Sequence, residues 1–231
     1  MKLGILETGR PPRSLQPQFG DYPAMFRALL GESAYDYTTY QVFDGQWPQA
    51  PKACDAYLVT GAAAGVYDPL PWIPELKAFL VAAKGKVPLI GVCFGHQVMA
   101  EAFGGRVIKS PKGWGVGLHE YQVVHREPWL DGPDVIHVAA SHQDQVVEPP
   151  PGARVIARSA FAPYGMLAYG DQPAISLQLH PEFARGYSEA LLEGRRGEFY
   201  GEAAASEARK SLEAPDDSAR IGGWFRRFLA G

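Results

Sequence analysis

Short apolar runs alternate with amphipathic segments through the N-terminal part of the chain. Four runs have the length and composition of single strands: residues 2–7, 37–43, 56–60 and 87–92. Two segments between them place apolar side chains at helical spacing: residues 22–30 and 71–83. The run at 87–92 is apolar without interruption, which is typical of a central parallel strand covered on both faces. Strands that alternate with helices predict an α/β fold with a doubly wound, mostly parallel sheet flanked by helices.

The pattern changes after Gly105, where short alternating segments are separated by Pro and Gly. These segments continue to Arg158 and predict a small antiparallel β insertion. Residues 174–179 then read as another core strand. The remainder, 184–231, is charged and periodic, and it predicts a helical extension whose last helix is amphipathic and packs across the sheet. Since neither an internal repeat nor a linker divides the sequence, we expect a single domain over 1–231.

Composition and charge exclude several classes of protein. The chain has 46% hydrophobic and 20% charged residues, as in an ordinary globular protein. A net charge of -3 argues against a nucleic-acid partner or an anionic membrane surface. Two cysteines in 231 residues provide no disulfide framework, and no signal peptide or bilayer-spanning run is recognisable. We therefore expect a cytoplasmic protein that does not insert into a membrane.

One cysteine lies where an apolar strand passes into an apolar helix. Cys93 is flanked by Gly91 and Gly95, in the pattern Gly-x-Cys-x-Gly. A nucleophile elbow has this form, because small flanking residues let neighbouring segments approach a sharp, strained turn. The N-terminus of the following helix also favours a thiolate. Cys93 is therefore a candidate nucleophile, whereas Cys54, in an apolar stretch, is typical of an inert core cysteine.

A thiolate nucleophile needs a base, most often a histidine held by a carboxylate. His180 follows the strand at 174–179, and Glu182 lies two residues further on, close enough to reach the same imidazole. His96, beside the cysteine, could instead act by proximity. Three other histidines in the alternating segments are typical of structural residues: His119, His125 and His137. No sequence spacing of His or Cys points to a metal site, and we expect neither a metal nor another cofactor.

Four motifs, in this order, resemble those of the class I, triad-type glutamine amidotransferases. The resemblance is closest to free-standing members related to the amidotransferase domain of GMP synthetase, and it extends from Lys2 to Phe183. The motifs are TGAAAGVYD at 60–68, GVCFGHQ at 91–97, SHQD with the following VVEPPPG at 141–152, and HPE at 180–182. Any one of them is weak, but four in order are specific.

This resemblance implies a flavodoxin-like fold and cleavage of the glutamine γ-amide through a γ-glutamyl thioester. It implies three sets of site residues: the catalytic Cys93, His180 and Glu182; the oxyanion-hole residues Gly61, Ala62 and Phe94; and the substrate-binding Gln97, Ser141 and His142.

The sequence departs from the family pattern in the Gly-Ala-Ala-Ala-Gly loop at 61–65 and at Leu179, where glycine is frequent. The residues after Phe183 are too few for a synthetase domain that could receive ammonia, so we expect the acceptor half to be missing from this chain. Three hypotheses therefore stay open. The protein hydrolyses glutamine and supplies ammonia to a separate synthetase subunit, it is a γ-glutamyl peptidase or hydrolase acting on γ-glutamyl conjugates, or it is a non-catalytic binding module. The first two imply a small-molecule substrate, glutamine or a γ-glutamyl compound.

Two positions outside the motifs also invite interpretation. Trp114, which lies among glycines, either covers the mouth of a pocket or serves as ordinary aromatic packing. The arginines of the C-terminal extension, Arg195 among them, could contact an anionic partner, but their acidic neighbours favour a solvated helical surface.

Overall fold

The computed structural model of the protein describes residues 1–170 and 172–231. Its strands are β1 (Lys2–Glu7), β2 (Asp36–Gln41), β3 (Ala56–Val59), β4 (Leu89–Val92), β5 (Arg106–Lys109), β6 (Gly115–Val123), β7 (Val135–His142), β8 (Asp144–Glu148), β9 (Ala153–Arg158), β10 (Met166–Tyr169) and β11 (Ala174–Leu177). Its helices are α1 (Gln16–Phe19), α2 (Tyr22–Leu30), the short 3₁₀ helix η1 (Val42–Asp44), α3 (Trp72–Ala83), α4 (Phe94–Ala102), α5 (Arg185–Arg195), α6 (Glu202–Ser211) and α7 (Ser218–Ala230).

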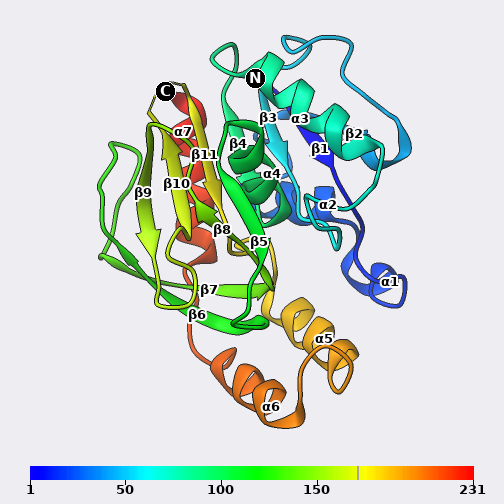
Figure 1. Ribbon diagram of the computed structural model, residues 1–231, viewed down its shortest axis with the longest axis vertical. Helices are drawn as coiled ribbons and strands as arrows, with labels where there is room; N and C mark the ends of the chain where they lie inside the picture. Colours follow the sequence, from blue (N-terminus) through cyan, green and yellow to red (C-terminus); the bar gives the residue numbers. More distant parts are fainter. Residues whose placement is uncertain (171) are drawn as a thin grey trace.

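A nine-stranded sheet with the order β2-β1-β3-β4-β11-β10-β9-β6-β7 forms the centre of the molecule (Figure 1). Its first five strands pair in parallel, as the alternation of strands and helices predicts. Successive side chains alternate between its faces: Leu58 joins one apolar cluster, and Tyr57 and Val59 join the other. Helices α2 and α7 cover the first face, and α3 and α4 cover the second. The carboxyl ends of the parallel strands therefore meet at one edge.

The antiparallel part is larger than the small insertion expected from the sequence, and most of it continues the same sheet. Strand β10 pairs antiparallel with β11 and with β9, and β6 pairs with β9 and β7. The apolar faces of these strands, including Tyr121, Ile136 and Ile156, join the same core cluster as β1. Strands β5 and β8 form a separate two-stranded sheet, which packs beside α4.

The C-terminal extension divides into two parts (Figure 1). Helices α5 and α6 lie together at one end of the molecule, where α6 packs against β6. Helix α7 returns to the sheet, and its Ile221, Trp224 and Phe225 are fully buried. The prediction that the last amphipathic helix packs across the sheet is confirmed. In the described part of the chain, no helix combines the length and apolarity needed to cross a membrane.

The turn between β4 and α4 is sterically constrained. Cys93 has φ 53° and ψ -105°, and it is the one non-glycine residue of 1–170 and 172–231 with a positive φ. A side chain in such a conformation costs about 1–3 kcal/mol. A Cβ on Gly91 would lie 2.5 Å from both the Gly95 carbonyl oxygen and Met99 Sδ, and one on Gly95 would lie 2.3 Å from the Val59 carbonyl oxygen. The flanking glycines are therefore needed for α4 to approach β3 and β4.

Replacing Gly95 with alanine should destabilise the protein by about 2 kcal/mol or more, because the new methyl group overlaps rigid backbone. Gly194 is a matched control: it lies in α5 with open space around its Cα. Gly194→Ala should leave stability unchanged or raise it by up to about 1 kcal/mol through helix propensity. Urea unfolding of both variants measures the difference. Equal stability of the two variants would contradict the close contact.

Trp224→Ala should lower the free energy of unfolding by about 3–5 kcal/mol, because it empties a fully buried site under the sheet. Trp224 Nε1 also donates a hydrogen bond to Asp131 Oδ1 over 2.8 Å. Trp224→Phe keeps much of the packing and loses this bond, so its cost should be smaller, on the order of 1–2 kcal/mol. Denaturant unfolding followed by circular dichroism gives both values. A loss below 1 kcal/mol for the alanine variant would mean that α7 is not part of the core.

Candidate active site

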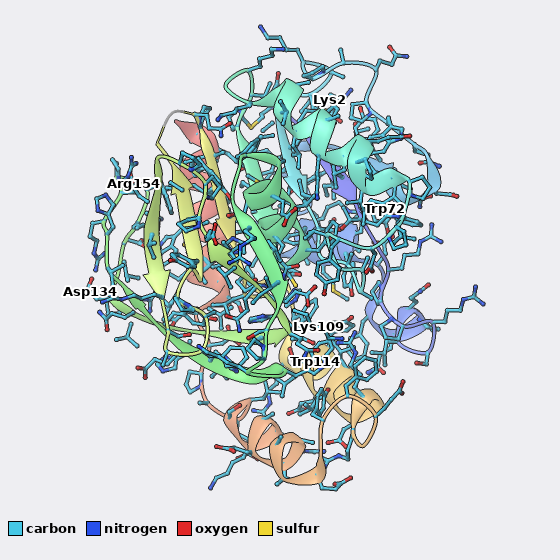
Figure 2. All side chains as sticks on the ribbon, viewed as in Figure 1. Lys2, Trp72, Lys109, Trp114, Asp134 and Arg154 are labelled. Atoms are coloured by element: carbon cyan, nitrogen blue, oxygen red, sulfur yellow. The ribbon has the colours of Figure 1, made fainter. Side chains whose placement is uncertain are left out.

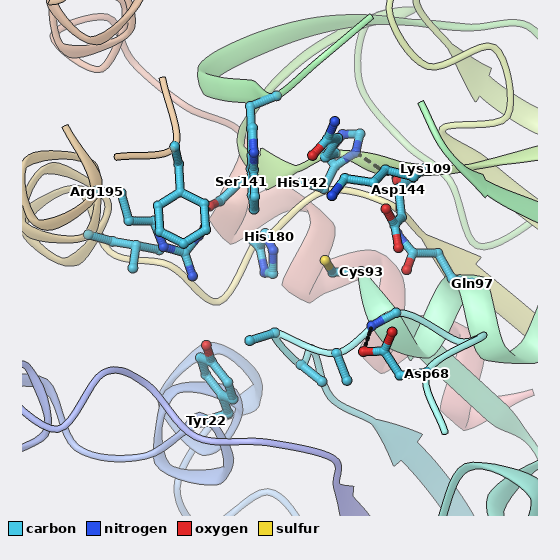
Figure 3. Close-up of a pocket in the computed structure, with 18 of the residues that line it drawn as sticks. Tyr22, Asp68, Cys93, Gln97, Lys109, Ser141, His142, Asp144, His180 and Arg195 are labelled. Carbon is cyan, nitrogen blue, oxygen red and sulfur yellow. Dashed lines mark hydrogen bonds between the residues drawn. The ribbon is translucent and has the colours of Figure 1, made fainter. Parts of the chain in front are cut away.

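A pocket of about 400 Å³ opens at the carboxyl edge of the parallel strands. Its walls come from the loop after β3, the elbow after β4, the turn between β7 and β8, the residues after β11, and the end of α5. Figure 3 shows Cys93 and His180 at its centre, with Arg195 on one side and Gln97 and Asp144 on the other. Segments far apart in the sequence therefore meet at the predicted site.

Cys93 and His180 both lie against the turn that follows β3. A Cβ built on Gly61 would be 3.2 Å from His180 Cε1 and 3.6 Å from Cys93 Cβ. Cys93 is 6% exposed and lines the pocket. The absence of a side chain on Gly61 thus allows its backbone to lie beside both residues.

The imidazole of His180 is held from two directions. Its Nδ1 donates a hydrogen bond to Glu182 Oε1 over 2.8 Å, and the Glu182 side chain is fully buried. The Phe183 ring stacks on the imidazole, with centroids 3.9 Å apart and planes 6° apart. These contacts fix the ring orientation and the tautomer, which leaves Nε2 for chemistry.

Charge stabilises the protonated form of His180. Burial alone would lower the pKa of this histidine, but the negative charges of Cys93 and Glu182, together with hydrogen bonds to both, raise the pKa to about 10. The arrangement can therefore hold an imidazolium beside Cys93 at neutral pH.

Backbone N–H groups lie next to the cysteine. Phe94 is the first residue of α4, and the first N–H groups of a helix have no partner within it. In the described part of the chain, no backbone hydrogen bond uses the N–H of Gly61, Ala62 or Phe94. The turn at Gly61 is fixed by Thr8, whose Oγ1 lies 3.0 Å from the Gly61 carbonyl oxygen. Such rigid, unoccupied donors can bind an oxyanion.

The three residues predicted to bind substrate also line the pocket, and each of their side chains already has a partner. Gln97 Nε2 donates to the Asp144 carbonyl oxygen over 2.9 Å, and His142 Nδ1 donates to the same oxygen over 3.1 Å. Burial lowers the pKa of His142 to about 3, so this ring is neutral. Ser141 Oγ accepts a hydrogen bond from Arg195 Nη1 over 3.0 Å. Gln97 and His142 thus hold the turn between β7 and β8 in place at Asp144.

His96, the alternative base, does not line the pocket. Its Nδ1 is 2.7 Å from Ser176 Oγ on β11, and burial lowers its pKa to about 3. Cys54 is buried on a different part of the sheet, with its Sγ 3.7 Å from the Tyr40 hydroxyl. Neither residue is arranged to react with a ligand in the pocket.

Three charged residues at the Gln97 side were not singled out in the sequence: Asp68, Asp144 and Lys109 (Figure 3). Asp68 Oδ2 accepts a hydrogen bond from the Gly65 N–H over 2.9 Å, and Asp144 Oδ2 accepts one from the Tyr67 hydroxyl over 2.8 Å. Burial raises the pKa of Asp144. Both aspartates belong to motifs of the family pattern, so the sequence contained a signal for them.

Arg195 corrects the prediction of a purely solvated surface on the C-terminal extension. Its side chain is half-buried and lines the pocket, because the end of α5 lies beside Ser141. Trp114, for which two interpretations were open, lines the pocket and packs edge-on against Phe199 with centroids 5.3 Å apart. No local sequence pattern indicates this position for Arg195.

Across residues 1–170 and 172–231, no three His, Cys, Asp or Glu side chains are grouped so that they could bind a metal ion.

Comparisons with known proteins extend over most of the chain. The glutamine amidotransferase-like protein C13C5.04 of Schizosaccharomyces pombe is 29% identical over 94% of this chain and 93% of its own length. Gamma-glutamyl peptidase 2 of Arabidopsis thaliana is 28% identical over 78% of this chain and 73% of its own. The glutamine-hydrolyzing GMP synthase of Thermus thermophilus is 34% identical over 56% of this chain, which corresponds to 25% of that protein.

A solved structure of a glutamine amidotransferase from Thermotoga maritima has the same fold, with a TM-score of 0.77 over 99% of both chains at 16% identity. The flavodoxin-like α/β fold predicted from the sequence is confirmed. Residues 36–193 match the family model described as glutamine amidotransferase class-I, and this range is more than half of the sequence. The resemblance carried by the four motifs is therefore confirmed, and the chain belongs to the class I glutamine amidotransferase family.

Proposed function

We propose that this protein hydrolyses the γ-amide of glutamine or of a γ-glutamyl compound through a thioester on Cys93. The observation that carries the proposal is the buried His180–Glu182 pair beside the strained Cys93, with unoccupied N–H donors at the adjoining turns. The family is one of enzymes, and this set of groups supplies each part of an acyl transfer. It also weighs against a non-catalytic binding module.

In the first step, the Cys93 thiolate attacks the γ-carbonyl carbon, and a C–S bond forms. The carbonyl oxygen becomes an oxyanion, which the N–H groups of Gly61, Ala62 and Phe94 stabilise by several kcal/mol. When the intermediate collapses, the C–N bond breaks and the leaving nitrogen takes a proton from His180. Glu182 keeps the imidazole oriented throughout.

In the second step, His180 takes a proton from water, and the water oxygen attacks the thioester carbon. The C–S bond breaks, and the sulfur leaves as the thiolate of Cys93. The net reaction converts the amide and one water into glutamate and ammonia or an amine. No additional reactant is required.

The charged residues near Gln97 suit the α-groups of a glutamyl substrate. We assign the α-ammonium group to the carboxylates of Asp68 and Asp144, and the α-carboxylate to Lys109. Gln97 and His142 then act as positioning residues, since both hold the Asp144 carbonyl oxygen. Ser141 borders the substrate through its backbone.

Two fates of the nitrogen are compatible with this chemistry. Ammonia from glutamine would pass to a separate synthetase subunit. A γ-glutamyl conjugate would instead release an amine, and two observations favour this candidate. The Arabidopsis thaliana peptidase aligns with a larger share of the chain than the Thermus thermophilus GMP synthase does. The pocket volume also falls in the range that holds ligands of drug size.

Cys93→Ala should reduce glutamate release from glutamine and from γ-glutamyl dipeptides by about 10³-fold or more, because it removes the nucleophile. Cys54→Ala is the matched control, since Cys54 is also buried but lies away from the pocket. It should keep its activity and lose only stability. An enzyme-coupled glutamate assay and labelling by a glutamine-like diazoketone, located by mass spectrometry, provide the readouts. Glutamate release by the alanine variant at the wild-type rate would refute the mechanism.

Cys93→Ser should lower the pKa of His180 below its value of about 10, because a neutral hydroxyl replaces the thiolate that stabilises the imidazolium. The Glu182 carboxylate remains, so part of the upward shift should persist. Imidazole ¹⁵N NMR over a pH titration measures the value. Cys54→Ser should leave the titration unchanged. If Cys93→Ser also leaves it unchanged, the thiolate–imidazolium pair is absent.

A further inference from the structure

The pocket extends past His180, away from the charged residues that we assign to the glutamyl group. Figure 3 shows Arg195 on the opposite side of His180 from Gln97, Lys109 and Asp144. Phe183, whose ring stacks on the imidazole, lines this end, as do Trp114 and Phe199. In Figure 2, Trp114 lies next to the segment that carries α5. This end, lined by Trp114, Phe183, Arg195 and Phe199, is called the aromatic end below.

The guanidinium of Arg195 lies among aromatic rings without an acidic partner. Its Cζ is 5.4 Å from the ring centroids of Trp114 and of Phe199, and its Nη1 donates to Ser141 Oγ. No carboxylate of the described residues forms an ion pair with it. The next residue, Arg196, differs: it is paired with Glu193 and Glu202. Arg195 is thus a half-buried cation in a pocket, with N–H groups left for an anion.

The chemistry sets the direction in which a substrate must lie. The leaving nitrogen has to take its proton from His180, so the group attached to that nitrogen lies on the imidazole side of Cys93. The aromatic end is on this side. Asp68 and Asp144 occupy the other side, where they would repel a second carboxylate.

We propose that the aromatic end is a leaving-group subsite, and that Arg195 selects γ-glutamyl peptides whose leaving amino acid has a free carboxylate and an apolar side chain. This inference rests on the proposed function. The guanidinium binds the carboxylate through charge-assisted hydrogen bonds, and the rings of Trp114, Phe199 and Phe183 contact the side chain. Ammonia, the leaving group of glutamine, has neither feature and would leave this end unused.

The position of these residues relative to the family match supports the assignment. The match ends at residue 193, so Arg195 and Phe199 lie beyond it. Tyr22, which also lines the pocket and stacks on Phe183 with centroids 6.1 Å apart, lies before the match begins at residue 36. The glutamyl side and the catalytic groups lie inside the match. The aromatic end therefore combines residues inside the family match with residues outside it.

The test compares three substrates: γ-glutamyl-phenylalanine, its C-terminal carboxamide, and glutamine. The wild-type protein should cleave the free acid with a kcat/KM about tenfold or more above that of the carboxamide, because only the acid offers a carboxylate to Arg195. In Arg195→Gln this ratio should fall to about one, and the loss should be smaller for glutamine than for the acid. Arg195→Lys keeps the charge and should retain part of the preference.

Arg185→Gln is the matched control, because Arg185 lies on the same helix, pairs with Glu189 and does not line the pocket. It should leave all three rates unchanged. Thermal unfolding of each variant reports whether it is folded. If Arg195→Gln does not fold, the acid-to-carboxamide ratio of the wild type and of Arg195→Lys decides.

Four results would overturn the inference. The subsite is refuted if the wild-type protein does not prefer the acid, or if the preference survives in Arg195→Gln. In either case, turnover of glutamine would leave the proposed function standing. An equal loss for glutamine in Arg195→Gln would mean that Arg195 binds the glutamyl carboxylate itself. Failure of every amide to react, with no labelling of Cys93 by the diazoketone, would refute the proposed function and the subsite with it.

Discussion

The close approach of helix α4 to strand β3 is the constraint on which the site depends. Gly95 lies so near the Val59 carbonyl that no other residue fits, and Gly95 N donates to the Thr60 carbonyl oxygen over 3.1 Å. This contact ties the start of the helix to the strand that leads into Gly61. Cys93 is held between them in a backbone conformation that other residues rarely adopt. Packing on both faces of the sheet offsets the free-energy cost of this strained conformation.

The local elements of the fold were predictable, because their patterns need only neighbouring residues. The helix expected at 71–83 is observed as Trp72–Ala83, and the strand expected at 2–7 as Lys2–Glu7. The pairing of β9 with β6 was not predictable, since β7 and β8 separate these two strands in the chain. An alternating pattern shows that a strand has one apolar face, but not which strand lies beside it.

The candidate site was likewise predictable only in part. Cys93, His180 and Glu182 lie in short motifs whose geometry is almost entirely local, and the structure places all three together. Arg195 and Arg196 are adjacent and look alike in sequence, yet one lines the pocket and the other pairs with glutamates. The difference arises from the packing of α5 beside Ser141, which no local pattern encodes. The side chains proposed to be catalytic were thus recognisable from the sequence, whereas the surface around them was not.

The stacking of Phe183 on His180 has a consequence for the order of events. A ring held face-on by Phe183 and bound through Nδ1 to Glu182 cannot turn, so a single nitrogen would serve both halves of the proposed reaction. The departing amine and the incoming water must then use the same place in succession. Water enters only after the first product has gone, and a tightly held amine would prolong the life of the acyl-enzyme. In the proposed mechanism the two products therefore leave one after the other, with glutamate last.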